Sequence, residues 1–253
     1  MATESVNGDP VYGKRVCLMT GAAGRLGTAF CRLFADQYDI VAVYRSRPPQ
    51  LPSQRQWLVD VLEPWAALPE NEHPVFAVQA DLERDGEVER VVDIALARFD
   101  RIDVVVNAAV HSVWAPMVDS NQALESAERQ FRVNTLLPAK LAVHVARTYW
   151  RDRDLENRTL NRNVVNVSSL AGVAVVPGMG QGVYSASKVA LNFLTRHLAD
   201  EFSRFGVRVN ALAPDSFPSR VRTRAVATAV NQLDRGGATG KVLVMDAGGQ
   251  RMQ

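Results

Sequence analysis

Residues 15–27 read RVCLMTGAAGRLG, an apolar run followed at once by a glycine-rich loop and the start of a helical pattern. The run Arg15–Thr20 predicts a strand, and the apolar periodicity of Arg25–Gln37 predicts a helix. Glycines at such a junction allow a tight turn and let backbone N–H groups approach a phosphate, which the dipole of the following helix also favours. The spacing differs from G-x-G-x-x-G, so an ordinary strand-to-helix turn stays open as the alternative to a phosphate-binding loop.

The same alternation of short apolar runs and longer helical patterns continues along the chain. The predicted strands are Arg15–Thr20, Ile40–Tyr44, Val75–Gln79, Val104–Asn107, Val164–Val167, Val207–Ala211 and Val242–Met245. The predicted helices are Arg25–Gln37, Val88–Phe99, Ala123–Tyr149 and Tyr184–Phe205, with a further one near Arg224. Because the strand runs are β-branched and nearly continuous, they predict strands buried on both faces of a mostly parallel sheet with right-handed crossovers. We therefore predict a seven-stranded, doubly wound α/β fold with helices on both faces.

Two stretches interrupt this pattern. Arg47–Pro74 carries six prolines and no clear period, and Arg151–Asn163 is highly charged. Both are interpreted as solvated surface, the first as a loop-rich insertion after the second strand. Because neither an internal repeat nor a clean linker occurs, residues 1–253 are predicted to form one domain, with residues 1–13 as a flexible N-terminus.

The composition excludes several classes of protein. A net charge of +2, from 29 basic and 27 acidic residues, does not indicate a nucleic-acid binder. No run approaches the ~18 apolar residues of a membrane span, and no secretory segment is visible, so we expect a cytoplasmic location. The two cysteines, Cys17 and Cys31, are expected to be buried and reduced. The histidines His73, His144 and His197 show no metal-ligand spacing, so no metal is expected.

The segment Tyr184-Ser185-Ala186-Ser187-Lys188 carries the most informative pair of side chains. Tyr184 and Lys188 are four residues apart on a predicted helix and so share one face. A phenol has a pKa of about 10, and a nearby ammonium favours the phenolate and lowers that pKa toward the range useful for acid–base catalysis. Ser168 and Ser169 close the fifth predicted strand, where a hydroxyl can polarise a substrate carbonyl.

These motifs, in this order, resemble the short-chain dehydrogenase/reductase family over Lys14–Gly249. The loop is similar to the family's T-G-x-x-x-G-x-G, except that Arg25 replaces the middle glycine and Gly24 is expected to take over part of the turn. Tyr184 and Lys188 match the family's Y-x-x-x-K. The arginine in the loop is similar to that of NADP-preferring members, pteridine reductases among them. The resemblance implies a Rossmann fold and an oxidoreductase.

The end of the second predicted strand bears on which nicotinamide cofactor binds. An NAD site usually places an acidic residue there to accept the ribose hydroxyls, but this chain has Tyr44-Arg45-Ser46-Arg47. Arginine can grip a 2′-phosphate through two charged hydrogen bonds. We therefore predict NADP(H), with Arg25, Arg45 and Ser46 as the phosphate contacts; the alternative is that these arginines are only solvated.

The resemblance extends the cofactor site to further strand ends. Asp81 and Leu82 look like the family's adenine-contacting pair, and Asn107-Ala108-Ala109 stands where the family shows N-A-G. The cofactor-binding residues predicted in this way are Gly21, Gly24, Arg25, Leu26, Gly27, Arg45, Ser46, Asp81, Leu82, Asn107, Ala108, Tyr184, Lys188, Pro214 and Ser219.

The resemblance also assigns catalytic roles. Tyr184 is the general acid/base, Ser169 the carbonyl-binding serine with Ser168 as its structural neighbour, although the two could exchange roles. Lys188 tunes the tyrosine and holds the nicotinamide ribose, and Asn134 holds a water that feeds the lysine. For Asn134 an exposed polar residue is the alternative interpretation. The implied reaction is hydride transfer between NADP(H) and a small carbonyl or alcohol.

The substrate end is less defined by the sequence. Asp215 replaces a family glycine, and the segment from there to the helix near Arg224 is short, which is consistent with an open site, a bulky substrate or a lid from another subunit. Arg220 and its neighbours either steer an anionic substrate or are solvated, and His111 either faces the pocket or is structural. The alternatives to a carbonyl reductase are a pteridine-reductase-like enzyme and a catalytically inactive NADP(H)-binding regulatory or scaffold protein. The resemblance implies a homotetramer or homodimer.

Overall fold

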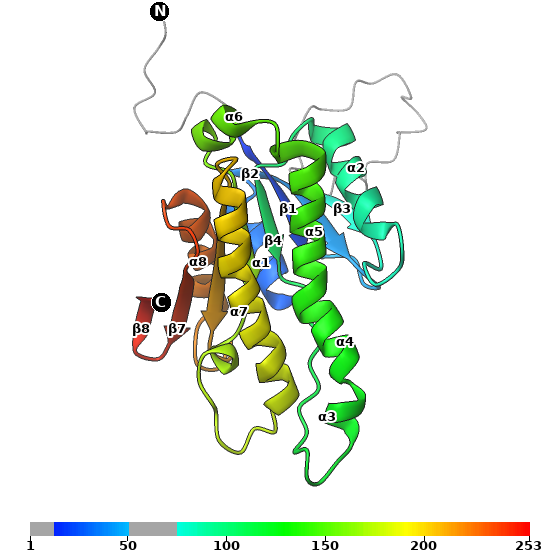
Figure 1. Ribbon diagram of the computed structural model, residues 1–253, viewed down its shortest axis with the longest axis vertical. Coiled ribbons are helices and arrows are strands. Elements are labelled where there is room, and N and C mark those ends of the chain that lie inside the picture. Colours follow the sequence, from blue (N-terminus) through cyan, green and yellow to red (C-terminus); the bar gives the residue numbers. More distant parts are fainter. Residues whose placement is uncertain (1–12, 51–74) are drawn as a thin grey trace, which may run out of the picture.

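A computed structural model describes residues 13–50 and 75–253. Eight strands form one sheet in the order β3-β2-β1-β4-β5-β6-β7-β8 (Figure 1). The strands are β1 Arg15–Thr20, β2 Tyr38–Tyr44, β3 Val75–Gln79, β4 Val104–Asn107, β5 Asn163–Val167, β6 Arg208–Pro214, β7 Val242–Asp246 and β8 Gly249–Met252. Seven of them run parallel, and only β8 is antiparallel to its neighbour β7. The doubly wound α/β fold is therefore confirmed, although seven strands was one too few.

The additional strand, β8, was missed because its residues give no apolar signal. All four of its residues are exposed. It pairs with β7 through backbone hydrogen bonds, from Asp246 opposite Gly249 to Leu243 opposite Met252, and Arg251 also pairs with the carboxylate of Asp246. An edge strand of this kind needs only backbone groups and a turn, which here is the Asp246–Gly249 segment.

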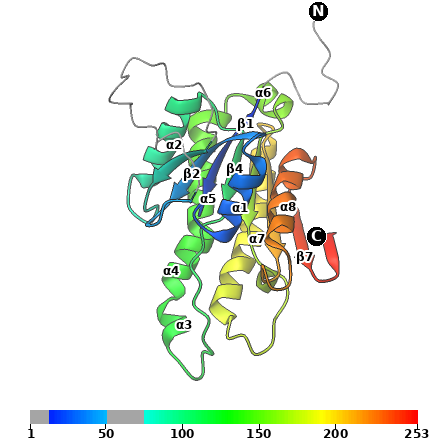
Figure 2. The same cartoon turned by 180° about the vertical axis from the view of Figure 1, so that it is seen from behind.

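Helices cover both faces of the sheet. They are α1 Arg25–Phe34, α2 Glu87–Phe99, α3 Gln122–Glu125, α4 Ala127–Phe131, α5 Leu137–Val145, α6 Asp154–Thr159, α7 Gly182–Ser203 and α8 Thr223–Arg235. Figure 1 shows α2, α5 and α7 in front of the sheet, and the view from behind in Figure 2 shows α1 and α8. Alternate side chains of β1 point to opposite faces of the sheet. Cys17 and Met19 pack with α1 and α8, whereas Leu18 packs with the helices on the other face.

The predicted single helix Ala123–Tyr149 is a succession of shorter segments. After α3 and α4 the chain widens into a π-helix at η2 (Arg132–Leu136), returns to an α-helix in α5, and widens again at η3 (Ala146–Trp150). Pro138 follows η2 and has no N–H to donate to the carbonyl four residues before it, which favours a local change of hydrogen-bond register. Apolar periodicity alone does not reveal such a change.

The charged segment Arg151–Asn163 was predicted to be solvated surface, and this was wrong for its second half. It contains α6, and Asn157, Arg162 and Asn163 are fully buried. Arg162 is accommodated because its guanidinium lies 3.5 Å from the buried carboxylate of Asp103 and stacks over the ring of Tyr149. A buried charge needs such partners. The closest ones, the carboxylate of Glu156 and the amide oxygen of Asn157, come from α6 itself, whereas Asp103 comes from a distant segment.

Other expectations concern smaller features. Cys17 and Cys31 are buried and free, as predicted. No helix in residues 13–50 and 75–253 is long and apolar enough to cross a membrane. The predicted flexible N-terminus, residues 1–13, lies almost wholly outside the described residues, as does most of the predicted loop-rich insertion Arg47–Pro74.

Candidate active site

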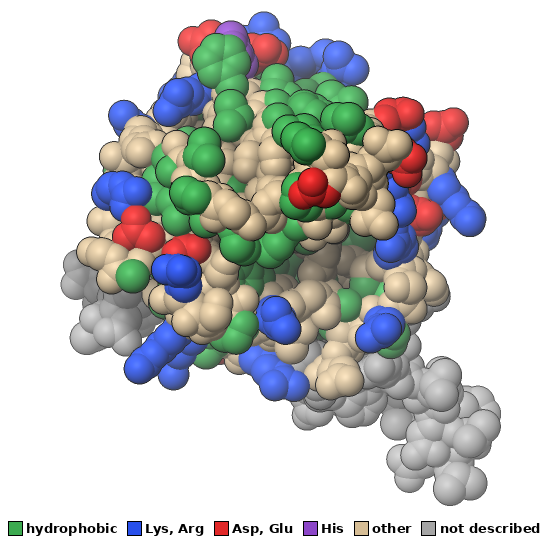
Figure 3. Space-filling view, turned by 90° about the horizontal axis from the view of Figure 1, so that it is seen from below, with side chains coloured by type: hydrophobic (Ala, Val, Ile, Leu, Met, Phe, Trp, Pro, Cys, Tyr) green, Lys and Arg blue, Asp and Glu red, His purple; other side chains and the backbone are tan. Residues whose placement is uncertain are grey.

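A cleft runs along the carboxyl ends of the central strands, where a doubly wound sheet binds its ligands because the crossovers on the two sides of β1 run in opposite directions. It consists of two hollows, of about 310 Å³ and about 430 Å³. The first hollow lies at the ends of β2 and β3, and the second at the ends of β5 and β6. Gly21 and Val110 line both, so the hollows meet at the glycine-rich loop. Figure 3 shows this end of the molecule, hollowed near its centre.

The glycine-rich loop is shaped by close contacts that exclude side chains. Gly21 has a φ of +67°, and a Cβ there would lie 2.6 Å from the carbonyl oxygen of Ala108. A Cβ at Gly27 would lie 2.4 Å from the Cα of Ala22. Gly24 donates its N–H to the carbonyl of Gly21 at 2.9 Å, so it closes the tight turn as expected. The loop therefore leaves a backbone-lined cradle at the N-terminus of α1.

The strand ends predicted to bind the adenosine half meet in the first hollow. Arg45 and Ser46 follow β2, and Asp81 and Leu82 follow β3. Asn107 lines the same hollow, but its amide also donates to the side chain of Asn166 at 2.9 Å and so ties β4 to β5. The remaining strand-end residue, Ala108, lines the second hollow.

The structure does not bring Arg25 into the first hollow with Arg45. Arg25 lines the second hollow and a shallow outer cleft of about 650 Å³, which it shares with Arg32, Arg47 and Arg224. The three predicted phosphate contacts therefore approach the cleft from two sides of the glycine-rich loop.

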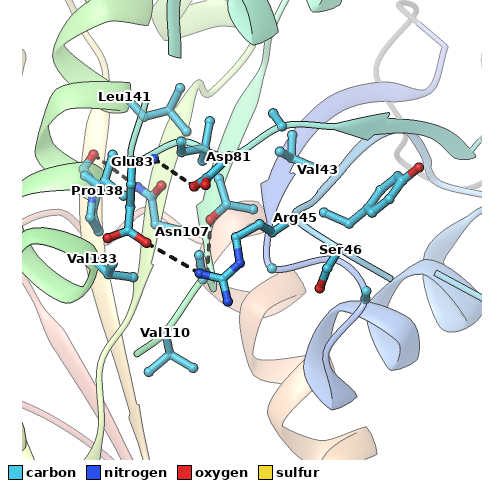
Figure 4. A pocket seen from close by; sticks show the side chains of 18 of the residues that line it. Val43, Arg45, Ser46, Asp81, Glu83, Asn107, Val110, Val133, Pro138 and Leu141 are labelled. Atoms are coloured by element: carbon cyan, nitrogen blue, oxygen red, sulfur yellow. Dashed lines mark hydrogen bonds and ion pairs between the residues drawn. The ribbon is translucent and has the colours of Figure 1, made fainter. Parts of the chain in front are cut away.

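The sequence analysis missed Glu83, a charged residue of the first hollow, and its partner Arg129, which does not line the hollow. Glu83 lines the hollow, and its carboxylate lies 3.4 Å from the guanidinium of Arg45 (Figure 4). Arg129 of α4 holds the same carboxylate, with Nη2 at 2.7 Å from Oε2 and Nε at 3.0 Å from Oε1. Because 38 and 46 residues separate Glu83 from these two arginines, no local pattern could reveal the cluster.

The side chains predicted to be catalytic come together in the second hollow. Ser169 follows β5, and Tyr184 and Lys188 lie on one face of α7. Ser169 and Tyr184 line the same hollow, and the Ser169 hydroxyl acts to lower the pKa of the Tyr184 phenol. The ammonium of Lys188 donates to the carbonyl of Val167 at 2.8 Å and lies 5.9 Å from the centre of the tyrosine ring. Ser168 lines the same hollow, but its hydroxyl donates to the backbone carbonyl of Lys188 at 3.4 Å.

Burial has the largest effect on the pKa values of Tyr184 and Lys188. It raises the pKa of Tyr184 above 10, and the Ser169 hydroxyl opposes that rise. Burial also lowers the pKa of Lys188 to about 7, because an ammonium is costly to hold away from water. The sequence-based expectation considered only the attraction between ammonium and phenolate, whereas in the fold desolvation acts on both groups and moves the tyrosine the other way.

Asn134 lies in the π-helical segment η2 and is fully buried, so the alternative of an exposed polar residue was wrong. Its side chain donates to the carbonyl of His111 at 2.8 Å and accepts the N–H of the same residue at 2.9 Å. It also donates to the hydroxyl of Ser187 on α7 at 3.0 Å. Asn134 thus connects the loop after β4 to the helix that carries Tyr184 and Lys188. His111 is held through its backbone and lines neither hollow.

The segment after β6 is short, and one predicted contact is absent. Pro214 and Asp215 line the second hollow, with the Asp215 carboxylate 3.8 Å from Arg220. Ser219 does not line it: its hydroxyl donates to the backbone of Ser216, which takes its place in the lining. The ring of Trp114 lies 6.1 Å from that of Tyr184. The apolar wall of the second hollow is formed by Val110, Trp114, Leu170, Val176, Met179 and Phe217.

In the described part of the chain, no group of three or more His, Cys, Asp or Glu side chains is placed to hold a metal ion.

Comparisons with known proteins point to one family. The family model described as short chain dehydrogenase matches residues 15–230. An uncharacterized short-chain type dehydrogenase/reductase of Sinorhizobium fredii is 31% identical over 88% of this chain, which spans 35% of that longer protein. The 1,6-dihydroxycyclohexa-2,4-diene-1-carboxylate dehydrogenase of Pseudomonas putida is 32% identical over 81% of this chain and 68% of its own length. Among solved structures, a short chain dehydrogenase from Mycobacterium avium superimposes with a TM-score of 0.74 at 25% identity, covering 95% of this chain and 85% of the other.

Proposed function

Because the chain belongs to the short-chain dehydrogenase/reductase family, we propose that it is an NADP(H)-dependent oxidoreductase acting on a carbonyl or alcohol substrate. The observation that carries the proposal is the grouping of Ser169, Tyr184 and the buried Lys188 in one hollow, at the end of a cleft that begins in a glycine cradle. Members of the family use a nicotinamide cofactor; the preference for NADP(H) and the role of Tyr184 are the parts proposed here.

The chemistry of the donor set fits a dinucleotide. The backbone of the glycine-rich loop would hold the pyrophosphate at the N-terminus of α1. A side chain at Gly21 would collide with the backbone of Ala108 and so displace this loop. Asp81 and Leu82 border the adenine end, and Arg45 with Ser46 would hold the 2′-phosphate. When bound, the nicotinamide supplies or accepts the hydride.

The chain's own residues supply the proton. In the reducing direction the phenol of Tyr184 gives its proton to the substrate oxygen as negative charge develops there, and the hydroxyl of Ser169 donates a hydrogen bond to the same oxygen. The raised pKa of Tyr184 keeps the phenol protonated at neutral pH, which suits an acid. Lys188, with a pKa of about 7, exchanges protons near neutrality and would restore the proton of the tyrosine. Asn134 keeps α7 in position against the loop after β4.

The second hollow has an apolar wall that includes Trp114, Met179 and Phe217, with Asp215 and Arg220 at the segment after β6. This wall favours a carbonyl on a largely hydrophobic skeleton. Residues 215–222 connect β6 directly to α8, so bulky substituents can extend past this short segment toward solvent.

The test is oxidation of NADPH in the presence of a panel of ketones, aldehydes, quinones and pterins, with Tyr184→Phe as the control. Turnover by the native protein that falls by about 10²-fold or more in the variant, with unchanged NADPH affinity, supports the proposal. Substantial activity remaining in Tyr184→Phe contradicts the role of the phenol. Tight NADPH binding with no turnover of any class favours the inactive, cofactor-sensing alternative.

We also propose that the chain forms a homodimer or homotetramer through α4, η2 and α7. These segments pack against one another and expose Phe131 and Leu136 from one side and Val189 and Phe193 from the other. Phe193 is 61% exposed, which is unusual for so large an apolar side chain. Light scattering after size exclusion should show an oligomer that Phe193→Glu converts to monomer; a monomeric native protein contradicts the proposal.

A further inference from the structure

Glu83 brings a negative charge to the place where the 2′-phosphate of NADP(H) would bind. No acidic residue follows β2 directly, yet the loop after β3 places this carboxylate 3.4 Å from Arg45 (Figure 4). An acid near the adenosine ribose disfavours a 2′-phosphate, because both are anions. The site therefore contains both a residue suited to bind the phosphate and a residue suited to repel it.

We propose that Glu83 determines the cofactor preference, acting as an internal anion that competes with the 2′-phosphate for Arg45, with Arg129 as its second counter-ion. The inference rests on the proposed function, since it assumes that Arg45 binds the 2′-phosphate. Glu83 is not one of the predicted phosphate contacts, which are Arg25, Arg45 and Ser46.

The two arginines hold the carboxylate unequally. Arg129 makes two close hydrogen bonds, at 2.7 Å and 3.0 Å, whereas Arg45 makes one contact at 3.4 Å. The side chain of Arg45 is 57% exposed, so it can turn without disturbing packed neighbours. When Arg45 turns to a phosphate, Arg129 remains to neutralise Glu83, and no buried charge is left without a partner.

Glu83 keeps its negative charge near neutral pH. The hydrogen bonds from Arg129 lower the pKa of the Glu83 carboxyl, partial burial opposes this, and the charges of Arg129, Arg45 and Arg132 lower it further. Competition for Arg45 is therefore constant near neutral pH, and the residue acts through its charge and position.

Other roles of Glu83 predict different changes in cofactor affinity when its charge is removed. If Glu83 held Arg45 ready for the phosphate, removing its charge would weaken NADPH binding. If it only stabilised the loop, its loss would weaken NADPH and NADH alike. The ratio of the two affinities therefore separates competition from both other roles.

The experiment measures the dissociation constants of NADPH and NADH by fluorescence titration, and those of 2′,5′-ADP and 5′-ADP by calorimetry. In Glu83→Gln we expect the preference for the 2′-phosphorylated member of each pair to increase about threefold to tenfold, with NADH changed less than about twofold. In Arg129→Gln we expect the preference to fall, because the unneutralised carboxylate holds Arg45 more firmly. Asp85→Asn is the matched control: it removes an equal charge from the same loop, on an exposed residue without an ion pair in the described part of the chain, and should leave the ratio unchanged.

The double variant Glu83→Gln/Arg129→Gln completes the test. If Glu83 competes with the 2′-phosphate for Arg45, Arg129→Gln should not change the ratio of NADPH to NADH affinity when Glu83 is already replaced by glutamine. An equal effect in both backgrounds means that Arg129 acts on the phosphate directly, and this overturns the proposal, as does a ratio that is unchanged or lower in Glu83→Gln.

The variant Arg45→Ala distinguishes an error in the 2′-phosphate assignment from an error in the proposed competition by Glu83. If Arg45→Ala weakens NADPH and NADH equally, the 2′-phosphate assignment is wrong and the inference falls with it. If Arg45→Ala weakens only NADPH binding while Glu83→Gln leaves the ratio unchanged, the cofactor assignment stands and the competition is refuted.

Discussion

Replacing Lys188 by methionine should make the protein more stable while abolishing its activity. The lysine is buried, and burial holds its pKa at about 7 instead of the ordinary 10.5. Between these two values the unfolded chain keeps the proton that the folded chain releases, so the native protein gains stability as the pH rises. A methionine of similar length has no charge to desolvate.

The magnitude follows from the two pKa values. At about 1.4 kcal/mol for each pKa unit, the buried lysine lowers the free energy of unfolding by about 4 kcal/mol at pH 7 and about 2 kcal/mol at pH 9. Methionine loses the hydrogen bond to the carbonyl of Val167, which costs about 1 kcal/mol at either pH. The expected net gain of Lys188→Met is therefore about 3 kcal/mol at pH 7 and about 1 kcal/mol at pH 9.

The assay is guanidinium unfolding of both proteins at the same concentration and at both pH values, because titrations common to the two cancel in the difference. Lys140→Met is the matched control: Lys140 lies on α5 with its side chain 46% exposed, 3.7 Å from Glu89. This control should change stability by less than about 1 kcal/mol at either pH. A Lys188→Met protein that is less stable than the native one, or whose gain does not shrink with rising pH, would refute the reasoning.

The remaining predictions concern the cofactor cleft and the opposite end of the sheet. Arg45→Ala should weaken NADPH binding by about tenfold or more and NADH binding little, measured by fluorescence titration; equal losses contradict the phosphate assignment. Gly21→Ala should weaken NADPH binding by about tenfold or more, because its Cβ would lie 2.6 Å from the Ala108 carbonyl oxygen in a left-handed conformation, while Gly237→Ala, with nothing within 4 Å, should bind normally. Asp234→Ala should lower the free energy of unfolding by about 3 kcal/mol or more, since it leaves the buried guanidinium of Arg15, held by two bonds of 2.9 Å, without its carboxylate; a loss below about 1 kcal/mol in denaturant titration would show that the other partners of Arg15 suffice.

The fold was largely predictable because a parallel sheet buried on both faces demands apolar strands. β1, β3 and β4 begin and end where the apolar runs predicted, and the other parallel strands differ only at their ends. The elements that were not predicted from the sequence are those whose formation does not require a run of buried apolar side chains. β8 is held by backbone hydrogen bonds, and the π-helical segments η2 and η3 depend on local hydrogen-bond register.

The candidate site was predictable where its residues are close in sequence or stand at strand ends. Tyr184 and Lys188 share a helix face because they are four residues apart, and Ser169 reaches them because β5 ends beside α7. Ser219 was placed by resemblance alone, and the short connection after β6 puts Ser216 in the hollow instead.

The amino-acid sequence was sufficient to predict the class of fold, the position of the glycine-rich loop and the candidate groups for proton transfer, because periodicity and short spacings translate directly into faces and strand ends. The pKa values of those groups depend on the folded structure. Burial, a property of the assembled layers, lowers the pKa of Lys188 and raises that of Tyr184. It also took the folded sheet to bring Glu83, Arg45 and Arg129 together, since electrostatic interactions depend on distance in space and not along the chain.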